Sequence, residues 1–178
     1  PADALMIWHG GMSFHGGLLG VIAAALLFCH LHKLRFFSLT DILACVASLG
    51  LLFGRLANFI NGELYGRTSD APWAMVFPRG GDAPRHPSQL YEAGLEGLVT
   101  LIILGLLARN KSVQTRERFL SGMFLILYGL FRSFCEFFRE PDIQIGFLAG
   151  GTTMGQILCI PMIAFGLWLV WKSRPIKI

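Results

Sequence analysis

The chain has 178 residues, of which 54% are hydrophobic and 15% are charged, and its formal net charge is +4. A soluble domain carries about 25% charged residues, so this composition excludes a water-soluble globular protein. We therefore expect an integral membrane protein that has membrane lipids, and no nucleic acid, among its partners.

Five apolar segments are long enough to cross a bilayer, the first of them by extension at both ends. They cover roughly residues 17–31, 39–60, 88–108, 119–138 and 153–171. A spanning segment must satisfy its own backbone hydrogen bonds, and no alternating barrel pattern is present, so all five are predicted to be helices. The predicted fold is a single all-α transmembrane domain over residues 1–178. Because five spans with the C-terminus inside would place Pro1 outside, we expect further spans before it.

The longest polar segment, residues 61–88, lies between the second and third predicted spans and is rich in glycine and proline. A connection this long is usually functional or disordered. Its aromatic residues Tyr65, Trp73 and Phe77 favour a folded extracytoplasmic cap at the membrane interface, with short strands near residues 73–77.

Basic residues predict the orientation, because lysine and arginine collect on the cytoplasmic side of membrane proteins. Nine of the fifteen, including all four lysines, follow the first, third and fifth spans. The other six, on the opposite side or in the spans near it, are Arg55, Arg67, Arg79, Arg85, Arg132 and Arg139. A guanidinium matches two phosphate or carboxylate oxygens at once, which lysine does not. The set indicates an anionic ligand reached from outside; contacts with lipid headgroups and loop carbonyls are the alternative, which suits Arg79 but not Arg55 or Arg132.

Two of these arginines, Arg55 and Arg132, lie inside otherwise apolar segments. A guanidinium at membrane depth costs at least about 2.5 kcal/mol, so we expect both to face the interior and to bind something anionic. Nearby polar residues recur at helical spacing, which predicts one polar stripe on each of three helices and a shared interior cleft. The stripes are Arg55, Asn58 and Glu63; Gln89, Glu92 and Glu96; and Tyr128, Arg132, Glu136 and Arg139. The alternative is a set of interhelical ion pairs that only fixes helix register.

Two histidines are candidates for chemistry, although a single interfacial histidine is more often a hydrogen-bonding residue. His15 lies among glycines at the outer end of the first span, and His86 ends the 61–88 segment. The sequence has no HExxH, paired-aspartate or Cys/His motif, so we expect no metal and no cofactor. Ser/His/Asp catalysis also lacks a nucleophile-elbow context. An arginine cluster in a cavity open to the bilayer, with a histidine and a tyrosine beside it, suits a phospholipid headgroup.

The sequence resembles the prolipoprotein diacylglyceryl transferases of bacterial inner membranes. Five blocks carry the resemblance in order from about Trp8 to Trp171, namely SFHGGLLG, GRLANFINGELYGR, RHPSQLYEAGLEG, YGLFRSFCEFFREPD and MGQILCIPM. The resemblance implies that the diacylglyceryl group of phosphatidylglycerol moves to the lipobox cysteine thiol at the signal peptide of a prolipoprotein. The products are a thioether and glycerol phosphate, and the site faces the periplasm. The carbon–oxygen cleavage puts charge on the departing phosphate, which arginines in a low-dielectric pocket stabilise.

The resemblance also implies residue roles. It makes His15, Arg55 and Arg132 the catalytic residues, with His15 the candidate base for a thiol whose ordinary pKa is about 8.5. The residues expected to hold the headgroup and the arginines are Asn58, Glu63, Gly66, Tyr128, Glu136, Arg139, His86 and Tyr91. An anionic-lipid transporter or flippase and a non-catalytic membrane scaffold remain as alternatives.

Overall fold

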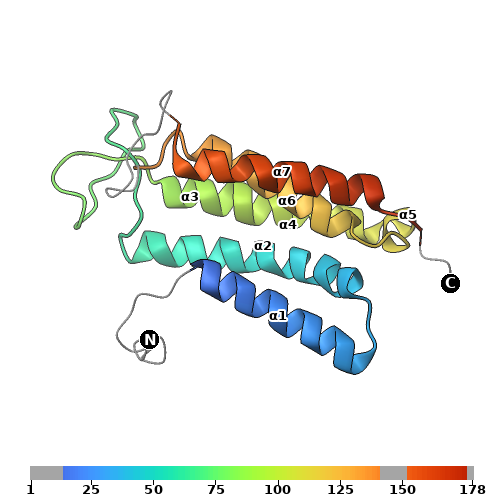
Figure 1. The fold of residues 1–178 in the computed structure, drawn as a ribbon. Coiled ribbons are helices and arrows are strands. Elements are labelled where there is room, and N and C mark those ends of the chain that lie inside the picture. The colour runs from blue at the N-terminus through green and yellow to red at the C-terminus, as the bar shows by residue number, and fades with distance from the viewer. Residues whose placement is uncertain (1–13, 141–151, 176–178) are drawn as a thin grey trace, which may run out of the picture. The chain divides into compact units, whose positions relative to one another are not determined.

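The computed structural model describes residues 14–140 and 152–175, and these ranges contain helices and no strand (Figure 1). The helices are α1 (Phe14–His32), α2 (Phe36–Ile60), α3 (Ser88–Glu92), the π-helix η3 (Ala93–Val99), α4 (Thr100–Arg109), α5 (Lys111–Gln114), α6 (Phe119–Cys135) and α7 (Met154–Lys172). The strands expected near residues 73–77 are absent from the described chain. Met75 instead makes one isolated bridge with Arg85.

Three of the described helices are long and apolar enough to cross a membrane, namely 36–60, the run through α3, η3 and α4 at 88–109, and 154–172. The apolar helices 16–32 and 119–135 are shorter. The all-helical membrane class is therefore confirmed. The number of five spans stays a prediction.

The chain divides into two compact units, residues 1–39 and 40–178. Within the first unit, α1 ends where Lys33 adopts a positive φ of 54° and the amide of Leu34 donates to the carbonyl of Cys29 at 2.9 Å. This six-residue closure satisfies a carbonyl that the end of the helix would leave unpaired. It is the expected way for an apolar helix to stop before a polar loop.

The second unit is built around the pair α6 and α7, which run side by side (Figure 1). Gly122 and Gly166 face each other: a Cβ atom added at Gly122 would lie 2.7 Å from the carbonyl oxygen of Gly166, and the reverse distance would be 2.8 Å. Small residues allow backbones to approach this closely in membranes. Arg132 lies on α6, one member of this closely packed pair.

Helix α2 meets the other helices of this unit near both of its ends. At the start, the buried carboxylate of Asp41 accepts from the amides of Arg118 and Ser121 at 2.8 and 2.7 Å, at the N-terminus of α6. The hydroxyl of Ser121 donates to Asp41 at 2.6 Å. Near the end, Gly97 of η3 lies so close to Leu52 that an added Cβ would be 2.6 Å from its Cα. The second contact brings Arg55, one turn further on, to the continuous helical run of α3, η3 and α4 over residues 88–109, which we call the third helix.

The segment 61–88 has a small apolar core of its own. Phe77 is 4% exposed and packs between Phe59, at 6.1 Å, and Tyr65, at 5.6 Å between ring centroids. The hydroxyl of Tyr65 donates to the carbonyl of Arg79 at 2.7 Å. The segment therefore packs around Phe77, and its place as an extracytoplasmic cap stays a prediction.

Candidate functional site

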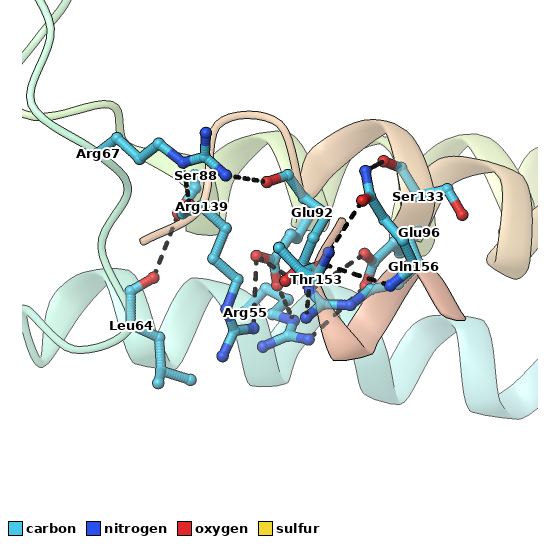
Figure 2. Close-up of polar contacts among 12 residues, drawn as sticks. Arg55, Leu64, Arg67, Ser88, Glu92, Glu96, Ser133, Arg139, Thr153 and Gln156 are labelled. Carbon is cyan, nitrogen blue, oxygen red and sulfur yellow. Dashed lines mark hydrogen bonds and ion pairs between the residues drawn. The ribbon is translucent and has the colours of Figure 1, made fainter. Parts of the chain in front are cut away.

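Six charged residues from α2, from the third helix, from α6 and from the residues just after α6 form a cluster in the second unit (Figure 2). We call it the arginine–glutamate cluster, and its members are Arg55, Glu92, Glu96, Arg132, Glu136 and Arg139. Each of the three predicted stripes contributes at least one of these residues, and Arg55 and Arg132 lie close together around the same glutamates, as predicted.

Glu92 is the centre of the cluster because it lies within ion-pair distance of all three arginines. Its Oε2 is 2.7 Å from Arg55 Nε, and its Oε1 is 3.4 Å from Arg132 Nη1 and 3.9 Å from Arg139 Nη1. Glu96 bridges the same first two arginines, at 3.7 Å from Arg55 Nη2 and 3.8 Å from Arg132 Nη1. Two guanidinium groups from different helices therefore share one pair of carboxylates.

The cluster is buried and evenly charged. The side chains of Glu92 and Glu96 are 1% and 0% exposed, whereas those of the three arginines are 13–16% exposed. Glu136 adds a third carboxylate, 2.8 Å from Arg132 Nη2. Three positive and three negative side chains thus face one another, which is the condition under which buried charges are tolerated.

Charge pairing in the cluster is not matched by well-directed hydrogen bonds. Among the described residues, both carboxylate oxygens of Glu92 and of Glu96, Nη1 of Arg132 and Oε2 of Glu136 are buried without a hydrogen-bond partner. Buried polar atoms nearly always have such partners, and a catalytic role is one of the reasons for an exception. The guanidinium groups are therefore held nearby by charge while their N–H directions are not fixed by the carboxylates.

Glu63 does not join the cluster, contrary to its predicted place on the Arg55 stripe. Its carboxylate pairs with Arg79 at 3.1 Å, and its side chain is 42% exposed. The stripe assumed that the helix continues past residue 60, but α2 ends at Ile60, and the chain then turns with positive φ at Gly62 and Leu64. The turn carries Glu63 off the face on which Arg55 lies. Its predicted role in substrate binding stays a prediction.

Gly66 is needed for its lack of a side chain. Its amide donates to the carbonyl of His86 at 2.9 Å, and it pairs with Arg139 in an antiparallel bridge. An added Cβ would lie 2.7 Å from the carbonyl oxygen of His86 and would also meet the carbonyl of Phe138. The close passage of this backbone fixes the chain around Arg139.

Two further predicted residues flank the central arginines. Asn58 is half-buried, one turn after Arg55, and its backbone carbonyl accepts from the amide of Glu63 at 2.9 Å. Tyr128 is half-buried one turn before Arg132, with its ring stacked on Phe124 at 5.8 Å. Their roles toward a ligand stay predictions.

His86 and Tyr91 form a second polar group with Trp73. The indole of Trp73 donates to the Tyr91 hydroxyl at 2.6 Å, and that hydroxyl lies 3.1 Å from His86 Nδ1. Since the indole only donates, the tyrosine hydrogen is available for Nδ1. Phe138 packs edge-on against both rings, at 5.2 and 5.5 Å.

Two of the outward arginines donate hydrogen bonds to backbone carbonyls. Arg67 donates through Nε to the carbonyl of Arg139 at 2.8 Å and through Nη2 to that of Glu136 at 3.2 Å (Figure 2). Arg85 donates to the carbonyls of Gly80 and Gly66 and pairs with Glu140 at 2.9 Å. Backbone carbonyls therefore bind Arg67 and Arg85, as the alternative interpretation predicted for outward arginines, and Arg85 and Arg79 are each also paired with a carboxylate.

His15 lies in the first turn of α1, but its side chain is outside the described residues. The sequence placed Glu92 and Glu96 on the polar stripe of the third predicted span but did not indicate a role for them in the site. The signal that identifies them is a polar residue at every fourth position of an apolar helix, from Ser88 through Glu92 and Glu96 to Thr100. No group of three or more His, Cys, Asp and Glu side chains suited to a metal is found in the described part of the chain.

Comparisons with known proteins agree with the sequence blocks. A family model described as prolipoprotein diacylglyceryl transferase matches residues 1–172. Three relatives are named phosphatidylglycerol–prolipoprotein diacylglyceryl transferase. The one from Rhodospirillum rubrum is 62% identical over 99% of this chain and 65% of its own length. Those from Azospirillum brasilense and Allorhizobium ampelinum are 57% and 55% identical over 98% of this chain, and the matches cover 66% and 61% of their lengths. The chain thus spans somewhat less than two thirds of these relatives, and it belongs to the prolipoprotein diacylglyceryl transferase family.

Proposed function

We propose that this chain carries the phosphate-binding site of an enzyme that transfers the diacylglyceryl group of phosphatidylglycerol to the lipobox cysteine of a prolipoprotein. The thiol sulfur forms a bond to the glyceryl carbon as the carbon–oxygen bond to the phosphate breaks. The thiol proton leaves to a base, and glycerol phosphate departs with the electron pair. The names of the relatives support both substrates.

The observation that carries the proposal is that Arg55 and Arg132, from different helices, are held by the same two buried glutamates. Breaking the glyceryl carbon–oxygen bond adds negative charge to the phosphate, and donors fixed in a dry site stabilise that charge strongly. Three guanidinium groups within one cluster supply such donors. Because directed hydrogen bonds do not hold these guanidinium groups to the glutamates, the groups are able to turn toward a phosphate.

The guanidinium nitrogens of Arg55 and Arg132 that do not approach the glutamates indicate how a phosphate would be bound. Arg55 approaches the glutamates through Nε and Nη2, and Arg132 approaches them through Nη1 and Nη2. This leaves Arg55 Nη1 and Arg132 Nε without an ion pair among the described residues. A phosphate between them would gain charge-assisted hydrogen bonds from both sides.

The remaining assignments come with the family. His15 takes the thiol proton, and Asn58, Glu63, Gly66, Tyr128, Glu136, Arg139, His86 and Tyr91 hold the headgroup or the arginines. The protein spans the bacterial inner membrane five times within this sequence, the segment 61–88 caps the periplasmic side, and the site opens to that side. The exposed apolar side chains along the helices are consistent with surrounding lipid.

A scaffold role is the second candidate, because equal numbers of arginines and glutamates balance each other without any ligand. A lipid transporter is less well supported. The buried carboxylate in the other half of α2, Asp41, already accepts three hydrogen bonds at the start of α6.

The test is incubation of the complete gene product with phosphatidylglycerol and a peptide that carries a lipobox cysteine. Mass spectrometry should find the diacylglyceryl thioether together with glycerol phosphate, and the matched peptide with serine in place of cysteine should stay unmodified. Hydrolysis or movement of phosphatidylglycerol without modified cysteine would refute the transferase.

A further inference from the structure

The third helix buries every fourth residue from Ser88 to Leu104. Ser88, Glu92, Glu96, Thr100 and Leu104 are each 0–1% exposed. An α-helix turns by about 100° per residue, so residues four apart drift by about 40°. Over the four steps from Ser88 to Leu104 the drift would reach about 160°, which would put the two ends of the row on opposite faces. A uniform α-helix therefore does not bury this row.

The π-helix η3 explains how the row stays on one face. It occupies Ala93–Val99, between Glu92 and Thr100, and its turns are closed by bonds to the fifth residue instead of the fourth. A π turn contains more residues than an α turn, so each residue rotates less about the helix axis. Residues four apart therefore shift in the opposite direction within η3, which offsets the shift that accumulates in α3 and α4. Single π turns of this kind occur often at functional sites.

Thr100 closes the last turn of η3 with two groups. Its hydroxyl donates to the carbonyl of Leu95 at 2.9 Å, and its backbone amide is shared between the carbonyls of Gly97 and Leu95. A threonine in an α-helix normally reaches the carbonyl three or four residues back. The five-residue reach of Thr100 depends on the π turn, and in return its buried hydroxyl stabilises that turn.

We propose that Thr100 is a positioning residue for the arginine–glutamate cluster: its hydrogen bond to Leu95 holds the π turn that keeps Glu92 and Glu96 facing Arg55 and Arg132. If the turn relaxed to an α-helix, its two flanks would rotate by about one residue, or roughly 100°, relative to each other. Gly97 is fixed against Leu52, and Leu104 is fully buried, so this rotation would be taken up by the glutamates.

The activity test rests on the proposed function and uses Thr100→Val, which keeps the shape but removes the donor, and Thr100→Ser, which keeps the donor. For Thr100→Val we expect a roughly tenfold lower kcat, or ~1.4 kcal/mol, with a smaller change in KM. The reason is that the cluster acts on charge that develops in the transition state. Thr100→Ser should keep at least about a third of the wild-type kcat. The matched control is Thr115→Val, which removes a similar hydroxyl-to-carbonyl bond of 3.0 Å at an exposed site, and it should behave as wild type.

Coupling to the cluster separates positioning from general destabilisation. In a Glu96→Gln background, Thr100→Val should lower kcat by less than threefold, because the group it positions is already altered. Equal loss in Thr100→Val and Thr100→Ser, or an undiminished tenfold loss in the Glu96→Gln background, would overturn the proposal.

Two further measurements cover the other outcomes. If Thr100→Val does not fold, Thr100→Ala and Thr100→Ser replace it, since they differ only in the hydroxyl, and equal kcat values for the two would overturn the proposal. If the wild-type protein forms no thioether, the proposed function fails by itself. The same double-mutant cycle is then measured on thermal stability, where additive shifts of Tm would refute the link between Thr100 and Glu96.

Discussion

Replacement of Arg132 by lysine keeps the positive charge but removes the planar fork. In the structure Arg132 uses two nitrogens: Nη1 lies 3.4 Å from Glu92 and 3.8 Å from Glu96, and Nη2 lies 2.8 Å from Glu136. A lysine ammonium at the same place still faces these carboxylates. We therefore expect Arg132→Lys to fold, whereas removal of the charge would leave buried glutamates unpaired.

The expected loss in activity follows from the hydrogen bonds that a point charge does not replace. If lysine holds the carboxylates, the phosphate loses at least one charge-assisted hydrogen bond, worth about 1.5–3 kcal/mol. Each 1.36 kcal/mol is tenfold in rate, so kcat/KM should fall about 10- to 160-fold. A residue that only fixes helix register would show no such loss.

The assay is the initial rate of thioether formation by the complete gene product at matched amounts of folded protein. Arg79→Lys is the control, because Arg79 is 70% exposed and its partner is Glu63 at the surface. Exposed ion pairs contribute about 0–1 kcal/mol, so this variant should stay within a few-fold of wild type. Equal rates for Arg132→Lys, Arg79→Lys and wild type would refute the phosphate-clamp reasoning and favour the scaffold.

Three other substitutions test the supports of the site. Asp41→Asn should lower the free energy of unfolding by about 1.5–3 kcal/mol, because a charged acceptor at the N-terminus of α6 is lost. It should leave kcat nearly unchanged, because Arg55 lies about 21 Å further along α2. A loss of kcat as large as that expected for Arg132→Lys would contradict this separation. Gly97→Ala should lower the free energy of unfolding by about 1–3 kcal/mol and should also lower kcat, because the added methyl group forces Leu52 away. Unchanged Tm and kcat would show that η3 and α2 do not pack tightly at Gly97. Gly66→Ala should lower the free energy of unfolding by at least as much, because backbone carbonyl oxygens surround the position of the missing Cβ. Thermal unfolding measures this loss, and wild-type stability would contradict the close packing of Gly66 against His86 and Phe138.

The central pair of the site could be predicted from sequence because burying a guanidinium in an apolar helix leaves few options. Arg55 and Arg132 had to face inward, and the 3.6-residue period placed Glu136 beside Arg132, where it lies at 2.8 Å. The same period failed for Glu63, since it applies only while the helix continues. Here the helix stops at Ile60.

Other features depend on tertiary structure that a helical period does not encode. The α-helical period predicts the stripe of Gln89, Glu92 and Glu96, and all three residues are buried. It does not predict that the buried row continues through Thr100 to Leu104 at a spacing of four residues, because that continuation needs a π turn. Arg67 donates hydrogen bonds to carbonyls at and just after the end of α6, and this depends on where the 61–88 segment crosses that helix. The aromatic residues near Met75 favoured strands, yet this part of the segment folds around Phe77 with one isolated bridge.

The most direct test of the account is an experimental structure of the complete gene product with phosphatidylglycerol bound. We predict that the lipid phosphate lies between Arg55 and Arg132, with its oxygens about 2.7–2.9 Å from nitrogens of both guanidinium groups. A phosphate bound elsewhere, with both arginines still turned to Glu92 and Glu96, would contradict the account.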